Sequence, residues 1–187
     1  MNKIYFVHPV NVYNEPIEAA FEELIAYYLT NNFKDLIENP NQPHHQRGYA
    51  EKGGMKYFYN DVLPDCMGAV ALPFLDRRIG LGVAGEIKWF FERQKPVWVI
   101  EPNNLGITPT LITLKTFINK PLCGLFMINP MQREDLIKIK YDDPRIVVPH
   151  EETRLRTWIV YGKIKRPYET AHLVKLPVPE DFYPNKV

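Results

Sequence analysis

The sequence predicts a single α/β domain, in which a parallel sheet is covered by helices on both faces, followed by an irregular C-terminal extension. Three observations lead to this prediction. Short apolar runs alternate with segments of helical periodicity over the first two thirds of the chain, and their connections are short. Beyond Pro130 prolines are frequent and periodicity is weak. The length of 187 residues fits one domain, which we divide into a core at 1–130 and an extension at 131–187.

The first predicted unit is a strand followed by a helix. The apolar run from Lys3 to Val7 predicts a short buried strand. Asn14-Glu-Pro16 then supplies a cap and a first-turn proline for a helix. Phe33 to Ile37 predicts a second strand, and the polar segment from Glu38 to Gly54 predicts a loop. The apolar face of the helix consists of Ile17, Ala20, Phe21, Leu24, Ile25 and Tyr28.

The next segments continue the alternation of helix and strand. Met55 to Val62 predicts a short helix, and the continuous apolar run from Met67 to Phe74 predicts a strand buried on both faces. Val83 to Gln94 predicts a second long helix, and Pro96 to Ile100 another buried strand. Ligands of such a sheet bind where the parallel strands end, so we expect the site at their carboxyl ends.

The pattern is weaker after Asn104. A helix is expected around Thr110 to Ile118 and a strand around Leu122 to Ile128, with β-like runs at Ile146 to Val148 and Trp158 to Val160. The sequence does not indicate what the extension does.

Composition excludes several classes of function. Lys and Arg number 23 and Asp and Glu 22, so a net charge of +1 gives no field that would attract nucleic acid or an anionic membrane. Cys66 and Cys123 form no disulfide framework or zinc motif, which favours a reducing cytoplasm. No apolar run approaches the ~20 residues of a membrane span. The chain contains no serine, which excludes a Ser-His-Asp hydrolase.

A glycine-rich segment between a predicted strand and helix carries the main chemical signal. Gly80, Gly82 and Gly85 spell GxGxxG, and Glu101 ends the next strand, as in Rossmann-like dinucleotide-binding proteins. The spacing argues against that interpretation, because residues 75–79 separate the first glycine from the end of its strand. Glycines that only permit a tight turn and close helix packing are a further alternative.

Glu86 offers a third interpretation of the same segment. It lies near the start of its predicted helix, where the helix dipole and free N–H groups favour the ionised carboxylate. An ionised carboxylate can attack the anomeric carbon of a sugar through an oxocarbenium-like transition state, while a second acid assists the departing group. A nucleobase that leaves a sugar requires the same assistance.

Three runs surround this segment: Asp65-Cys-Met-Gly-Ala-Val-Ala-Leu-Pro-Phe74, Gly82-Val-Ala-Gly-Glu-Ile87 and Gln94-Lys-Pro-Val-Trp-Val-Ile100. In their order and spacing these runs resemble the nucleoside 2-deoxyribosyltransferase family and its nucleotide N-glycosidase relatives. The resemblance covers about residues 1–130 and implies a flavodoxin-like sheet. It also implies a homo-oligomer in which neighbouring subunits complete each site, a nucleoside or nucleotide as substrate, and no metal or organic cofactor.

The resemblance also implies residue roles. Glu86 would be the nucleophile that forms a glycosyl-enzyme intermediate, and Tyr5 would orient it. The family usually has an acid six residues before the glutamate, where this chain has Gly80. The acid that contacts the base would then be Asp61 or Asp76. Gly80, together with the other two glycines of the turn, would shape the sugar pocket.

Other polar residues are candidates for substrate binding. Arg77 and Arg78 lie side by side and would bind a 5′-phosphate, which would favour nucleotide hydrolysis, although a solvated loop is the alternative. His8, at the end of the first strand, either lines the site or is a hydrogen-bonded core residue. For His44 and His45 we expect a polar loop and no metal, because adjacent histidines point apart and no acid has ligand spacing. The rival to an enzyme is a nonenzymatic nucleotide-binding module that keeps the fold.

Overall fold

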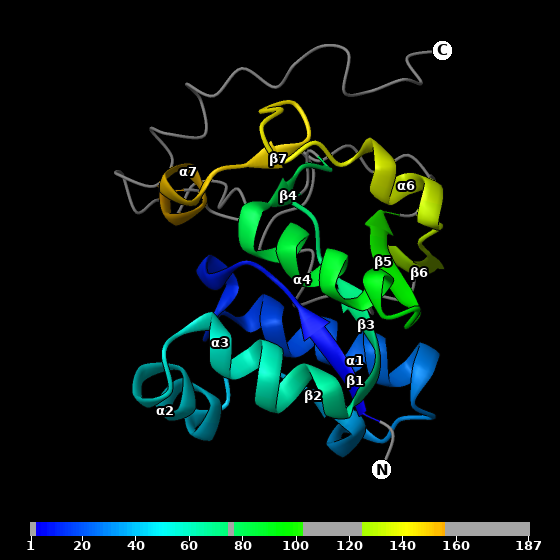
Figure 1. Ribbon diagram of the computed structural model, residues 1–187. Coiled ribbons are helices and arrows are strands. Elements are labelled where there is room, and N and C mark those ends of the chain that lie inside the picture. Colours follow the sequence, from blue (N-terminus) through cyan, green and yellow to red (C-terminus); the bar gives the residue numbers. More distant parts are fainter. Residues whose placement is uncertain (1–2, 75–76, 103–124, 156–187) are drawn as a thin grey trace, which may run out of the picture.

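A five-stranded sheet forms the centre of the molecule. The computed structural model describes residues 3–74, 77–102 and 125–155, and Figure 1 shows their arrangement. The strand order is β2-β1-β3-β5-β6. The first four strands of this order run parallel, whereas β6 is antiparallel to β5. The predicted α/β class is confirmed, and the sheet is mixed rather than wholly parallel. The strands are β1 Lys3–Val7, β2 Ile37–Glu38, β3 Cys66–Ala71, β5 Val97–Pro102 and β6 Phe126–Pro130.

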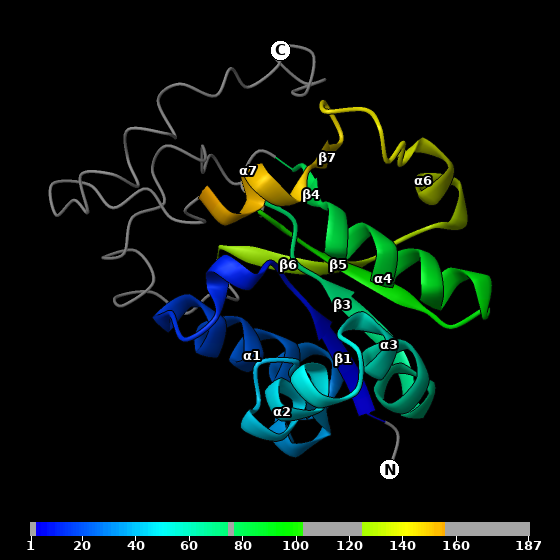
Figure 2. The ribbon, with the colours of Figure 1, turned by 60° about the vertical axis from the view of Figure 1, so that its left-hand side comes forward.

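The strand order places a topological switch point at β1. The chain moves from β1 to β2 on one side and then crosses to β3 on the other, which is the flavodoxin-like order with its last strand reversed. Connections diverge there, and in open α/β sheets ligands bind outside the carboxyl ends of the strands at such a point. Helix α1 (Pro16–Leu29) covers one face of the sheet, and α4 (Leu81–Glu92) covers the other (Figure 2).

Alternation along β1 explains how the two faces are filled. Ile4 and Phe6 pack into the cluster that includes the buried face of α1, whereas Tyr5 and Val7 pack into the cluster of α4. Successive side chains of a strand point to opposite faces, so one short strand supplies both cores. Each fully buried aliphatic or aromatic side chain contributes roughly 1.5–3 kcal/mol. Tyr5 thereby lies beneath α4.

The helix that follows β1 begins where the sequence predicts. Glu15 is the N-cap and Pro16 the first residue, where a missing N–H costs nothing. The preceding Asn14 has a φ of 61°, a left-handed conformation that asparagine tolerates better than most residues. A short 3-10 turn, η1 (Val10–Val12), joins β1 to this cap.

The segment between α1 and β3 differs from its prediction in two places. The sequence predicts a strand from Phe33 to Ile37, but a 3-10 turn, η2 (Lys34–Leu36), fills most of that segment and β2 is confined to Ile37–Glu38. The expected loop contains a helix, α2 (Pro43–Glu51), with its proline at the first position. Gly48 lets α2 approach α3 (Met55–Tyr57), because a Cβ at Gly48 would lie 2.3 Å from the ring of Tyr57.

The predicted short helix at 55–62 is confirmed, although its winding changes along its length. After α3 the chain continues as a π-helix, η3 (Phe58–Val62), and then as a 3-10 turn, η4 (Leu63–Asp65). The next predicted strand and helix are also present, as β3 and α4. Helix α4 begins at Leu81, two residues before the predicted start at Val83, with Gly80 as its N-cap.

The extension packs on the start of α4. The two-residue strand β4 (Ile79–Gly80) pairs in parallel with β7 (Val147–Val148), which lies in the predicted β-like run at 146–148. Two short helices, α6 (Arg133–Lys138) and α7 (His150–Leu155), flank β7 in sequence. The strand expected at 122–128 is described only from residue 125, where β6 follows. The helix expected at 110–118 and the strand expected at 158–160 lie outside the described residues. Within the described ranges, no helix has the length and apolar character that crossing a membrane requires.

Candidate functional site

A buried glutamate and a buried tyrosine meet between β1 and α4. The hydroxyl of Tyr5 donates a hydrogen bond of 2.9 Å to Oε1 of Glu86. The side chain of Tyr5 is fully buried, and Glu86 is only 8% exposed. The two residues are 81 positions apart in sequence and are joined by the packing of α4 on β1. This contact is the one that the family resemblance leads us to expect.

Burial controls the protonation of Glu86. It raises the pKa of the carboxyl from its ordinary value of 4.5 to about 8, and the hydrogen bond from Tyr5 opposes this rise only in part. Burial therefore opposes the ionised carboxylate that the position of Glu86 near the helix start leads us to expect. Helix α4 begins at Leu81, and the influence of the helix dipole is greatest within the first turn. Glu86 lies beyond that turn. Loss of hydration exceeds the remaining electrostatic stabilisation.

Two further tyrosines interact electrostatically with this carboxyl group, and the sequence analysis does not single them out. Burial and the charge of Glu86 raise the pKa of Tyr13, which follows η1 beyond the end of β1. The same two causes raise the pKa of Tyr59, in η3. Both hydroxyls therefore remain protonated and are available as donors. Their positions, one after β1 and one before β3, are the only sequence signal that would have suggested them.

Gly85 makes room for one of these hydroxyls. A Cβ at Gly85 would lie 3.1 Å from the hydroxyl oxygen of Tyr59, which is tighter than ordinary contact. A Cβ at Gly82 would make only an ordinary van der Waals contact, since its nearest atom would be Cε1 of His150 at 3.7 Å. Tyr141, from the extension, donates a hydrogen bond of 3.2 Å to the carbonyl oxygen of Ala84. The extension therefore contacts α4 close to Glu86.

Of the two candidate acids for contact with a base, the structure describes only Asp61. Asp61 is exposed and forms an ion pair of 3.0 Å with the exposed Lys52, so the structure does not bring it to Glu86. Asp76 lies outside the described residues. Gly80, which occupies the family's acid position, is buried between Phe74 and Thr153.

The two arginines of the loop have different environments. Arg78 is buried, pairs with Glu152 at 3.0 Å and donates to the carbonyl oxygen of Pro144 at 3.1 Å. Arg77 is exposed, with a φ of 64°. The expected pair of neighbouring phosphate ligands is therefore not formed, because Arg78 ties the loop to the extension.

His8 is a hydrogen-bonded core histidine, one of the two alternatives. Its Nδ1 lies 2.9 Å from the carbonyl oxygen of Phe6, and its Nε2 lies 3.0 Å from Oε1 of Glu18. The ring is buried and stacks on the ring of Phe6 with centroids 4.1 Å apart. Hydrogen bonds from His8 and Asn39 outweigh burial and lower the pKa of Glu18. These contacts anchor the end of β1 to α1.

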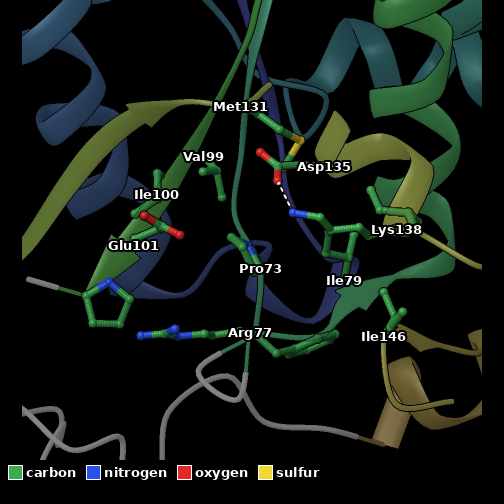
Figure 3. Close-up of a pocket in the computed structure, with 13 residues that line it drawn as sticks. Pro73, Arg77, Ile79, Val99, Ile100, Glu101, Met131, Asp135, Lys138 and Ile146 are labelled. Carbon is green, nitrogen blue, oxygen red and sulfur yellow. Dashed lines mark hydrogen bonds and ion pairs between the residues drawn. The ribbon is translucent and has the colours of Figure 1, made fainter. Parts of the chain in front are cut away.

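A separate cavity of about 300 Å³ opens at the carboxyl ends of β3 and β5 (Figure 3). Its walls are mainly apolar, and Arg77 and Glu101 lie along one side. Oε2 of Glu101 accepts a hydrogen bond of 2.7 Å from Asn129. On the opposite side Asp135 and Lys138 pair at 3.1 Å. Glu86 does not line this cavity.

The glycines do not form a dinucleotide-binding turn. Strand β3 ends at Ala71, well before Gly80, and Gly82 and Gly85 lie within α4. In the dinucleotide fingerprint the first glycine closes the strand and the backbone approaches the pyrophosphate ahead of the helix. The structure therefore gives no support to that alternative.

The described residues contain one cluster with metal-ligand chemistry, formed by Glu38, His44 and His45. His45 is buried on α2, and its Nε2 lies 2.6 Å from Oε1 of Glu38. The expectation that these histidines lie in a loop without an acid partner is wrong, because β2 brings Glu38 to them. Hydrogen bonds from His45 and Lys3 outweigh burial and lower the pKa of Glu38 to about 2.

Comparisons with models of known protein families, with curated proteins and with solved structures give no match.

Proposed function

We propose that this protein cleaves or transfers the N-glycosidic bond of a nucleoside or nucleotide, with Glu86 as the nucleophile. The hydrogen bond between Tyr5 and Glu86 carries the proposal, because it holds one carboxylate oxygen and leaves the other to react. The position beside the switch point of the sheet supports it, since ligands of such folds bind there. The sequence resemblance adds a substrate class.

The proposed reaction has two displacement steps. The ionised carboxylate of Glu86 attacks the anomeric carbon, the bond from that carbon to the base nitrogen breaks, and the departing base takes up a proton from water. Water or a second base then attacks the same carbon, gives up a proton to solvent, and releases the carboxylate. The hydroxyls of Tyr13 and Tyr59 are protonated and interact electrostatically with Glu86, which supports a role for them in binding sugar hydroxyls or the departing base.

The proton on Glu86 determines when the reaction proceeds. With a pKa of about 8, the carboxyl is largely protonated at pH 7, and only the ionised fraction is nucleophilic. The rate is therefore expected to rise with pH until it levels off above about 8.

Base release is the direct test. The purified protein is incubated with nucleosides and 5′-monophosphates, with and without an acceptor base, and products are separated by chromatography. Glu86→Gln should abolish release, whereas Glu92→Gln, an exposed change on the same helix, should preserve it. Release that persists in Glu86→Gln, or no release from any substrate, would reject the proposal.

The second candidate function is a nucleotide-binding module without turnover. The protonated state of Glu86 near neutrality and the glycine at the family's acid position favour it. It predicts saturable binding of nucleosides in equilibrium dialysis with no base released at any pH.

The expected homo-oligomer is tested separately by light scattering, because subunits that complete each other's sites would give a mass above 21.9 kDa.

A further inference from the structure

We infer that Glu38, His44 and His45 form a binding site for a divalent transition-metal ion such as Zn²⁺, separate from Glu86. One carboxylate oxygen and two imidazole nitrogens all lie within 4.8 Å of one another. Two histidines and one carboxylate are a donor set that zinc accepts, with the remaining position left for water. The inference is independent of the proposed glycosidic function.

The two buried ligands are already aimed at a common point. Nε2 of His45 and Oε1 of Glu38 are 2.6 Å apart, with one proton between them. An ion that replaces this proton would bind both atoms at about 2.0–2.2 Å after a small separation of the two side chains. Their side chains are only 5% and 7% exposed, so neighbouring atoms restrict their rotation.

Groups behind the ligands hold them in place. The hydroxyl of Tyr57 lies 2.9 Å from Nδ1 of His45, which leaves Nε2 directed at Glu38. Lys3 binds the second oxygen of Glu38, so Oε1 remains the oxygen that faces the histidines. Partners of this kind fix the orientation of ligands at metal sites.

His44 completes the set and provides access from solvent. It precedes His45 on α2, and the two rings have centroids 4.0 Å apart. His44 is exposed, so an ion can approach from outside and reach the buried pair. Bound there, the ion would link α2 to the edge strand β2.

Lys3 supplies a specific electrostatic test. Its ammonium group lies on the same carboxylate and opposes a bound cation, although its side chain is 40% exposed and can turn toward solvent. Lys3→Met should therefore tighten binding of the ion, whereas a cluster that is only a network of hydrogen bonds would lose stability and gain no affinity.

The experiment titrates the chelator-treated full-length protein with Zn²⁺ alone, in competition with a chromophoric chelator, and follows thermal unfolding in parallel. We expect one ion per chain, a higher Tm with Zn²⁺, and affinity that falls more than about tenfold in His44→Ala and Glu38→Gln. His150→Ala, which removes an exposed histidine outside the cluster, should bind as wild type. Absence of one-to-one binding, or equal affinity in wild type and His44→Ala, would overturn the inference. His44→Ala removes an exposed side chain, so its result does not depend on a folding defect.

Discussion

Replacement of Glu86 by glutamine should change how stability depends on pH. In the folded protein the carboxyl has a pKa of about 8, whereas in the unfolded chain it titrates near 4.5. Between these values the folded state keeps a proton that the unfolded state releases, so wild-type stability falls as pH rises. At about 1.4 kcal/mol per pKa unit, the loss from pH 4.5 to 8 is on the order of 4–5 kcal/mol. Above about pH 8 both states are ionised and the loss is complete.

Glu86→Gln removes this contribution and keeps the shape and an oxygen that accepts the hydrogen bond of Tyr5. Urea unfolding of wild type and variant, followed by circular dichroism at pH 5 to 9, gives the difference in free energy of unfolding at each pH. The other titrating groups are common to both proteins and cancel. The variant should gain a few kcal/mol relative to wild type between pH 5 and 8, and Glu92→Gln should gain nothing comparable. Parallel profiles for wild type and Glu86→Gln would refute the reasoning that burial keeps this carboxyl protonated.

Three further predictions concern the contacts around the site. Tyr5→Phe removes the hydrogen bond that lowers the pKa of Glu86, so the pH at which base release reaches half its maximum should rise. Activity at pH 7 should then fall roughly tenfold, and an unchanged pH profile would contradict this reasoning. Gly85→Ala should lower activity severalfold without loss of Tm, because the added Cβ displaces the hydroxyl of Tyr59. Gly82→Ala should keep activity, so equal activity of the two variants would contradict the account. Arg78→Met should lower the free energy of unfolding in urea by about 2–3 kcal/mol, because it breaks a buried ion pair. The ratio of activities on a monophosphate and its nucleoside should stay unchanged. A selective loss of activity on the monophosphate would instead identify Arg78 as a phosphate ligand.

Local signals were sufficient for the main elements of the sheet and its covering helices. The cap and proline before α1, the apolar run of β3 and the periodicity of α4 each indicate their element without tertiary information. Helix α2 was missed because it is polar and has no apolar stripe. Its position depends on contacts with the neighbouring elements β2 and α3, namely His45 against Glu38 and Gly48 against Tyr57.

Only some residues of the candidate site can likewise be predicted from the sequence. Glu86 and Tyr5 can be selected from the sequence, because the family resemblance assigns a role to each of them. Tyr13 and Tyr59 cannot, since only the fold brings them near the carboxyl group. The protonation of Glu86 was also beyond a sequence argument. Position in a helix is visible in sequence, whereas desolvation depends on the atoms that surround the group.

The central claim is that Glu86 forms a covalent bond to the sugar. Its most direct test is the mass of the denatured protein after brief incubation, at pH 8, with the nucleosides and nucleotides of the panel and with 2-fluorinated analogues that slow the second step. The account predicts a mass increase equal to the glycosyl group, which maps to the peptide containing Glu86 and is absent in Glu86→Gln. Base release without any adduct, or an adduct on another residue, would contradict it.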